Sequence, residues 1–182
     1  MRRTLLLSTL GILAALGASA QTADPDSKTV SEPEFAGVVF RLDAGKLIPL
    51  ERQSTANIRT TTSGFMVVHA KSVWVFAGAK SSVRFGKEAL EFVARASAEI
   101  DPTLIYHLRK LDSRKKTREM TLATARGTPL GASATNQTDD ALPVTFARYG
   151  SSSIKITVTI LPPGEYAIQA TPSQAVFCFG VD

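Results

Sequence analysis

The sequence predicts an all-β fold, either an antiparallel β-sandwich or a partly open barrel, with about 9–11 strands. Apolar and polar residues alternate with a period of two through most of the chain after residue 34, and turn residues recur at short intervals. Helical periodicity is lacking, since the most helix-like segment, residues 87–100, alternates equally well as a strand. An immunoglobulin-like or fibronectin-like sandwich is compatible with this pattern.

The C-terminal part of the chain carries the clearest strands. In residues 154–160, every second residue is Ile or Val and the others are Lys or Thr, which indicates one buried and one solvent-facing side. The Leu-Pro-Pro-Gly segment 161–164 ends this strand, because proline cannot donate to a β-ladder. Residues 165–170 and 175–181 predict two further strands, and the last is apolar on both faces, which favours a central or covered position.

The earlier strands are expected to be shorter and joined by compact turns. They are predicted at residues 35–42, 46–50, 64–70, 73–76, 82–85, 90–96, 104–111 and 118–123. Asp43-Ala44-Gly45 favours a tight hairpin turn, and residues 112–116 join another hairpin. Residues 127–141 are rich in Gly, Ala, Ser, Thr and Asn, which predicts a long loop.

The N-terminus has the three parts of a secretory signal peptide. Two arginines follow Met1, an apolar run spans residues 5–17, and Ala18-Ser19-Ala20 supplies small residues for a signal peptidase. The apolar run is shorter than the about 20 residues that cross a bilayer. We therefore expect cleavage between Ala20 and Gln21, a periplasmic or extracellular protein, and no transmembrane segment in the mature chain.

After the signal peptide, residues 1–20, the sequence divides into two parts. Residues 21–34 are polar and contain two prolines, which predicts a flexible lead-in. Residues 35–182 are expected to form a single β domain. The one cysteine, Cys178, cannot form an internal disulfide and lies between two phenylalanines, which favours a small buried side chain over a reactive thiol or an intermolecular bridge.

No segment has the pattern of a catalytic, metal or cofactor site. His69 and His107 lie in separate predicted strands, whereas a zinc site needs three or four converging ligands. Ser151-Ser152-Ser153 lacks the context of a nucleophile elbow and predicts a polar turn. We assign no catalytic residue, metal or cofactor. A catalytic pair of carboxylates that meet only in the folded protein stays an open alternative, because such a pair leaves no pattern in the sequence. The acids in or beside predicted strands are Glu51, Glu91, Glu119 and Glu165.

The most unusual local feature is a basic hairpin. Six cations lie within ten residues, with Asp112 the only acid among them. They are Arg109, Lys110, Arg114, Lys115, Lys116 and Arg118. Such a cluster attracts phosphates, acidic polysaccharide or anionic lipid headgroups; alternatively, the lysines only keep a soluble hairpin from edge-to-edge aggregation. Nucleic acid is not an expected partner, because no row of stacking aromatic residues accompanies the charge.

The C-terminal segment resembles a group of exported bacterial β-rich proteins that end in a Pro-Gly-Glu-Tyr-Ala turn and a Phe-Cys-Phe-Gly-Val-Asp terminus. These motifs occupy residues 163–167 and 177–182, and residues 46–51 and 82–85 are similar to further shared segments. The resemblance implies a compact β domain and a bacterial envelope setting, but no activity and no site residue. Tyr166 also resembles the tyrosine corner of β-sandwiches.

Two functions are compatible with these observations. The first is an exported, non-catalytic β-sandwich that serves as a binding or scaffolding module of the bacterial cell envelope, with an anionic envelope polymer or lipid surface as the candidate partner of the basic hairpin. The alternative is a hydrolase that acts on cell-envelope polymers, which rests on the expected compartment and on the fact that catalytic carboxylates pair in space and leave no sequence pattern.

Overall fold

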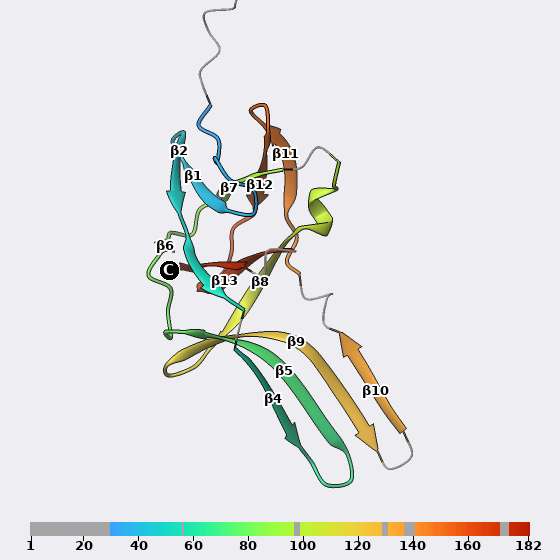
Figure 1. Cartoon of the computed structure of the whole chain (residues 1–182). Coiled ribbons are helices and arrows are strands. Elements are labelled where there is room, and N and C mark those ends of the chain that lie inside the picture. Colours follow the sequence, from blue (N-terminus) through green and yellow to red (C-terminus); the bar gives the residue numbers. More distant parts are fainter. Residues whose placement is uncertain (1–29, 56, 97–98, 129–130, 137–140, 172–174) are drawn as a thin grey trace, which may run out of the picture.

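The computed structural model describes residues 30–182 with short gaps, and it is all-β (Figure 1). The gaps are residues 56, 97–98, 129–130, 137–140 and 172–174. Nearly all strand pairs are antiparallel, and one sheet is curled into a half-barrel, which confirms the predicted fold class. The predicted signal peptide and most of the lead-in lie outside the described residues. Within the described part of the chain, no helix is long and apolar enough to span a bilayer.

The first sheet has five strands and holds the hairpin that the sequence predicts around Gly45. In sheet order these strands are β11 (Thr145–Tyr149), β12 (Ser153–Val158), β7 (Leu90–Arg95), β1 (Val39–Asp43) and β2 (Lys46–Pro49). Ala44 and Gly45 both have positive φ, 46° and 81°, as a two-residue type I′ turn requires.

The second sheet has nine strands and carries most of the C-terminal segment. Its path runs β3 (Glu51–Ser54), β14 (Ala175–Val181), β13 (Gly164–Ala170), β8 (Tyr106–Ser113), β9 (Thr117–Thr128), β5 (Val68–Ala77) and β4 (Ile58–Ser63). Two short strands join it at the sides: β10 (Gly131–Asn136) pairs with β9, and β6 (Arg84–Phe85) pairs in parallel with β14. A short 3-10 helix, η1 (Pro102–Leu104), precedes β8.

The core lies on both faces of β14, as its apolar sequence predicts. Phe177 and Phe179 point into the main cluster between the sheets, where the rings of Phe92 and Phe179 lie 5.1 Å apart. Val176 and Cys178 point the other way, into a smaller cluster that includes Phe76, Leu111 and Met120. Every residue of β14 is buried, so this strand fixes the C-terminus at the centre of the protein.

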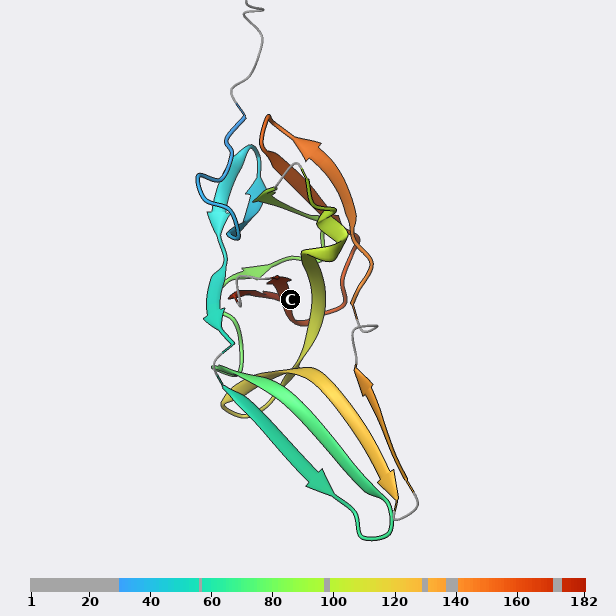
Figure 2. The ribbon, with the colours of Figure 1, turned by 45° about the vertical axis from the view of Figure 1, so that its right-hand side comes forward.

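The strands β4, β5, β9 and β10 extend beyond the core as a curved arm (Figures 1 and 2). Here the strand predictions are partly wrong. The predicted strands 64–70 and 73–76 are one strand, β5, and the predicted loop 127–141 contains β10. Strands β3, β4, β10 and β11 were not expected, so the described residues form 14 strands instead of about 9–11. Every residue of β4 is exposed, so it carries no alternation of buried apolar side chains.

The fold begins before residue 35, because part of the predicted lead-in is anchored. The Glu32 carboxylate accepts hydrogen bonds from the backbone amides of Ser151 and Ser152 at 2.8 and 2.9 Å, and from all three hydroxyls of residues 151–153. These bonds lower the pKa of Glu32 to about 2. Pro33 is buried, and its carbonyl accepts from Arg95. Residues 32–34 therefore belong to the domain.

Candidate functional site

The predicted basic hairpin forms, but its six cations divide between the surface and the interior. Strands β8 and β9 meet at the turn around Lys115, as expected. Four of the six are exposed: Lys110, Arg114, Lys115 and Lys116. Arg109 is 8% exposed and Arg118 is fully buried, because both lie within strands that have neighbours on either side. Only four of the predicted site residues can therefore contact an outside surface.

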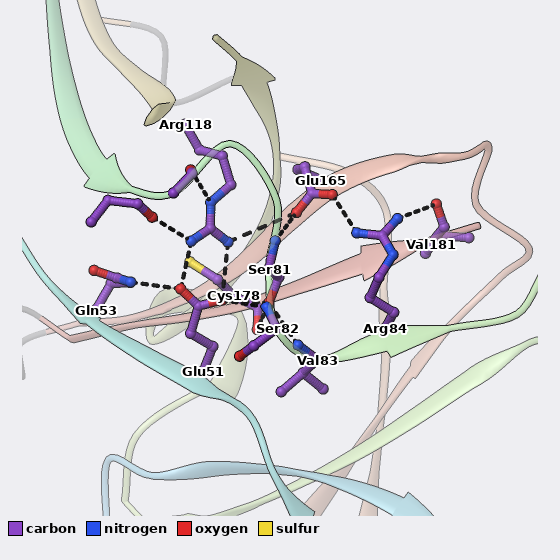
Figure 3. A network of polar contacts seen from close by, with 12 residues as sticks. Glu51, Gln53, Ser81, Ser82, Val83, Arg84, Arg118, Glu165, Cys178 and Val181 are labelled. Atoms are coloured by element: carbon purple, nitrogen blue, oxygen red, sulfur yellow. Dashed lines mark hydrogen bonds and ion pairs between the residues drawn. The ribbon is translucent and has the colours of Figure 1, made fainter. Parts of the chain in front are cut away.

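Arg118 is the centre of a buried ionic network where the arm leaves the core (Figure 3). Its guanidinium binds both carboxylate oxygens of Glu51, with Nη2–Oε1 and Nη1–Oε2 distances of 2.5 and 3.2 Å. It also donates to the carbonyls of Ala77 and Gly78, at 2.8 and 3.1 Å. Since Glu51 begins β3 and Ala77 ends β5, Arg118 joins three strands through one side chain.

From Arg118 the network continues to the C-terminal residue, and basic and acidic side chains alternate along it. Glu165 lies 3.8 Å from Arg118 and accepts hydrogen bonds from the amide of Ser81 at 2.7 Å and from Arg84 at 2.6 Å. Arg84 in turn binds Asp182, and these contacts raise the pKa of Arg84 above its ordinary value. Each buried charge thus has at least one partner of opposite sign, as burial requires.

The electrostatics of Glu51 indicate a structural role. Burial raises the pKa of its carboxyl, but hydrogen bonds from Arg118, Ser81 and Gln53 outweigh burial and hold the pKa at about 2. A general acid must retain its proton near neutral pH. Glu51 is ionised there and both of its oxygens are engaged. The network therefore stabilises the fold and does not have the features of an acid–base pair.

Other groups that the sequence raised as catalytic candidates are also engaged in the structure. Burial raises the pKa of the Cys178 thiol to about 12, so it stays protonated and packs as a small apolar side chain. The three serines of residues 151–153 form a polar turn that binds Glu32, as described above. Among the described residues, no three His, Cys, Asp or Glu side chains lie close enough together to hold a metal ion.

A basic groove of about 530 Å³ lies on the arm, beside the turn between β8 and β9. We define the basic groove by its ionisable lining residues, which are Arg59, His69, Lys71, Arg114 and Glu119. Glu119 is 3% exposed and lies 2.5 Å from Arg59 and 3.5 Å from Arg114. Both arginines remain more than half exposed, so their outer faces are accessible to an anion.

Sequence reasoning found Arg114 but missed Arg59 and Lys71. Strand pairing brings them together: in the ladder between β4 and β5, Arg59 pairs with Val73 and Thr61 pairs with Lys71. The one available signal was spacing, because Arg59 and Thr61, like His69 and Lys71, are two residues apart and so share a sheet face. Because the sequence alone does not predict a strand over β4, the spacing of Arg59 and Thr61 does not indicate by itself that they share a face.

The chain matches no known protein family model, and no curated protein is similar to it in sequence. The resemblance of the C-terminal motifs to exported bacterial proteins stays a prediction.

Proposed function

We propose that this is an exported, non-catalytic β protein of the bacterial cell envelope that binds an anionic surface. The observation that carries the proposal is the excess of exposed cations in the basic groove and in the neighbouring turn, which holds Lys115 and Lys116. Export is expected from the signal-like residues 1–20. Arg114 belongs to both the turn and the groove, so their cations form one continuous region.

The charge balance of the region supports attraction of an anion. The buried carboxylate of Glu119 is shared by Arg59 and Arg114, and Asp112 lies 3.3 Å from Lys71. Two acids therefore face three cations, and the two turn lysines add to this excess. At physiological salt the Debye length is about 8 Å, so cations lining one groove act together on an approaching charge. Exposed guanidinium groups also match the fork geometry of phosphate and carboxylate groups.

The hydrolase alternative gains no support from the carboxylates that meet in space. Glu51 and Glu165 both lie beside Arg118, but each is held by ion pairs and by Ser81. Cleavage of a glycosidic bond needs one carboxyl that stays protonated to donate to the leaving group. With a pKa of about 2, Glu51 is ionised at neutral pH and does not hold the proton that this step needs.

The test is salt-dependent retention on a sulfated polysaccharide matrix, measured for matched pairs of variants. Lys115→Gln/Lys116→Gln removes two charges from the turn, and Lys46→Gln/Arg148→Gln removes two exposed charges from the first sheet. We expect wild type to be retained at low salt, the turn variant to elute at clearly lower salt, and the control variant to elute near wild type. Wild type that flows through at low salt, or equal losses in both variants, would overturn the proposal.

A further inference from the structure

The turn between β4 and β5 forms the far end of the arm and is apolar (Figure 2). It contains four consecutive apolar residues, 65–68, and Phe65 is 98% exposed, Met66 75% and Val68 37%. Single exposed apolar residues are common, but a run of this length at one point is typical of a functional surface. Among the residues that the structure describes, the other large exposed apolar side chains form no such run: Val30, Phe35, Ile58, Ile100, Leu104 and Ile160.

The local backbone holds these side chains at the apex. Gly64 has φ of +106°, a conformation that residues with a Cβ rarely adopt. A Cβ at this position would collide with the carbonyl oxygen of Val67. The tight turn therefore depends on Gly64, and it leaves Phe65 and Met66 exposed at the apex.

A band of basic residues lies behind the apolar apex. His69 and Arg126 face each other across β5 and β9, and both are exposed. Lys71 follows on the same face of β5, at the basic groove. Residues 58–77 and 120–136 of the arm contain no Asp or Glu at all. The tip thus combines an apolar end with the exposed Arg126, while Lys71, further from the apex, is paired with Asp112 of β8.

We propose that the arm tip inserts into an anionic phospholipid bilayer, with Phe65 and Met66 among the upper acyl chains and Arg126 and Lys71 against lipid phosphates. This inference rests on the proposed function and specifies its surface. Apolar insertion and basic attraction are the two signals that together give stable attachment to a membrane interface. An aromatic side chain is also favoured at that depth.

Charge decides between a bilayer and the other surfaces that the tip could meet. A second copy of the chain would bring its own Arg126 and Lys71 against these cations, which repels like charges. A polysaccharide offers anions but no apolar layer, so Phe65 would gain nothing from it. Of these three surfaces, the anionic bilayer is the one that matches both parts of the tip.

Insertion is tested with a tryptophan placed at the apex of the full chain, in the Phe65→Trp variant, and both tryptophan variants carry Trp74→Phe so that the native tryptophan does not contribute to the emission. The control is Leu104→Trp, because Leu104 is also exposed, at 69%, but lies in η1 outside the arm. Vesicles of phosphatidylglycerol and phosphatidylcholine in equal parts should shift the Phe65→Trp emission to the blue and allow quenching by brominated acyl chains. Pure phosphatidylcholine vesicles, and the Leu104→Trp variant, should give neither effect.

A second variant separates this inference from the proposed function. Phe65→Ser/Met66→Ser should weaken binding to the mixed vesicles by about tenfold or more, because it removes the apolar area that enters the bilayer. Its salt-sensitive retention on the polysaccharide matrix should stay at the wild-type value, since no charge changes.

Two results would overturn the inference while leaving the proposed function intact. The first is vesicle binding during which the Phe65→Trp emission remains that of a residue in water. The second is a blue shift that depends on protein concentration without lipid, which would show that a second copy covers the tip. Absence of binding to both vesicles and matrix would instead refute the proposed function itself.

Discussion

Replacing Arg118 by methionine tests whether the buried network holds the arm to the core. Methionine keeps an unbranched stem but removes the cation and all its donors. Glu51 then loses its bidentate partner, and the carbonyls of Ala77 and Gly78 lose a donor each. Glu165 loses a charge at 3.8 Å but keeps Arg84.

The structure gives the size of the expected loss. Removing one partner of a buried ion pair costs about 3–5 kcal/mol, because the remaining charge is left uncompensated. The Glu51 side chain is 17% exposed, so water can replace part of what Arg118 supplied. The two carbonyls add a cost of about 1 kcal/mol each. We therefore expect the free energy of unfolding to fall by about 3–5 kcal/mol, which is a large part of the about 5–15 kcal/mol typical of a domain.

The pH dependence distinguishes the charge of Arg118 from its packing. The pKa of Glu51 is about 2 in the folded protein, against an ordinary value of 4.5. A lowered carboxyl pKa stabilises the fold above the ordinary value, and this stabilisation is lost as pH falls toward 2. Without Arg118 the pKa of Glu51 rises and this contribution shrinks, although the hydrogen bonds from Ser81 and Gln53 remain. The difference in unfolding free energy between wild type and Arg118→Met should therefore be smaller at about pH 3 than at pH 7.

The assay is urea denaturation followed by circular dichroism, at both pH values. Arg118→Lys keeps the charge but not the fork, so it should lose less stability than Arg118→Met. Lys115→Met, at an exposed turn position, should stay within about 0.5 kcal/mol of wild type. A loss in Arg118→Met of under about 1 kcal/mol at pH 7 would refute the reasoning. An equal loss at both pH values would show that packing, and not charge, is responsible.

Three further predictions concern single contacts. Tyr166→Phe removes the 2.7 Å hydrogen bond to the Pro162 carbonyl, and should lower the unfolding free energy by about 0.5–1.5 kcal/mol in urea titration. Glu32→Gln should destabilise the protein at neutral pH but not near pH 2. The Glu32 carboxyl has a pKa of about 2 in the folded protein, so the stability that it contributes is lost as the pH falls from 4.5 toward 2. Thermal melts at both pH values check this. Cys178 should react with a thiol reagent only after the protein unfolds, and fast labelling of the native protein would contradict its burial.

The sequence predicted the core strands well because burial leaves a periodic signal. Strand β12 alternates apolar with polar residues, since one of its faces is covered. Strand β14 is covered on both faces and is therefore apolar throughout. The tyrosine hydroxyl of Tyr166 bonds back across the preceding turn, as its resemblance to a tyrosine corner implied.

The arm was harder to predict because its strands face solvent. In β4 every residue is exposed, so pairing with β5 is the main constraint on its sequence. Threonine and serine dominate β4, and these residues are compatible with loops as well as strands. The backbone hydrogen bonds that define the arm leave little trace in the pattern of side chains.

For a different reason, the sequence could not predict which cations of the basic hairpin are buried and which are exposed. A cation such as Arg118 is expected at the surface unless a partner is known to be near. Its partner Glu51 is 67 residues away in the sequence, and the two meet only when β3, β5 and β9 have assembled. Lys115 and Lys116, by contrast, lie in a turn whose exposure follows from local sequence.

The buried network around Arg118 explains why the apolar tip of the arm stays exposed. An apolar end such as Phe65 would gain by folding back onto the protein and removing its surface from water. Arg118 opposes this, because it ties the last residues of β5 to the start of β9 and to Glu51 of β3 at the base of the arm. The buried cation of the hairpin thus fixes the direction of the arm, while its exposed neighbours supply charge at the surface. An arm anchored in this way keeps Phe65 and Met66 free to contact a bilayer.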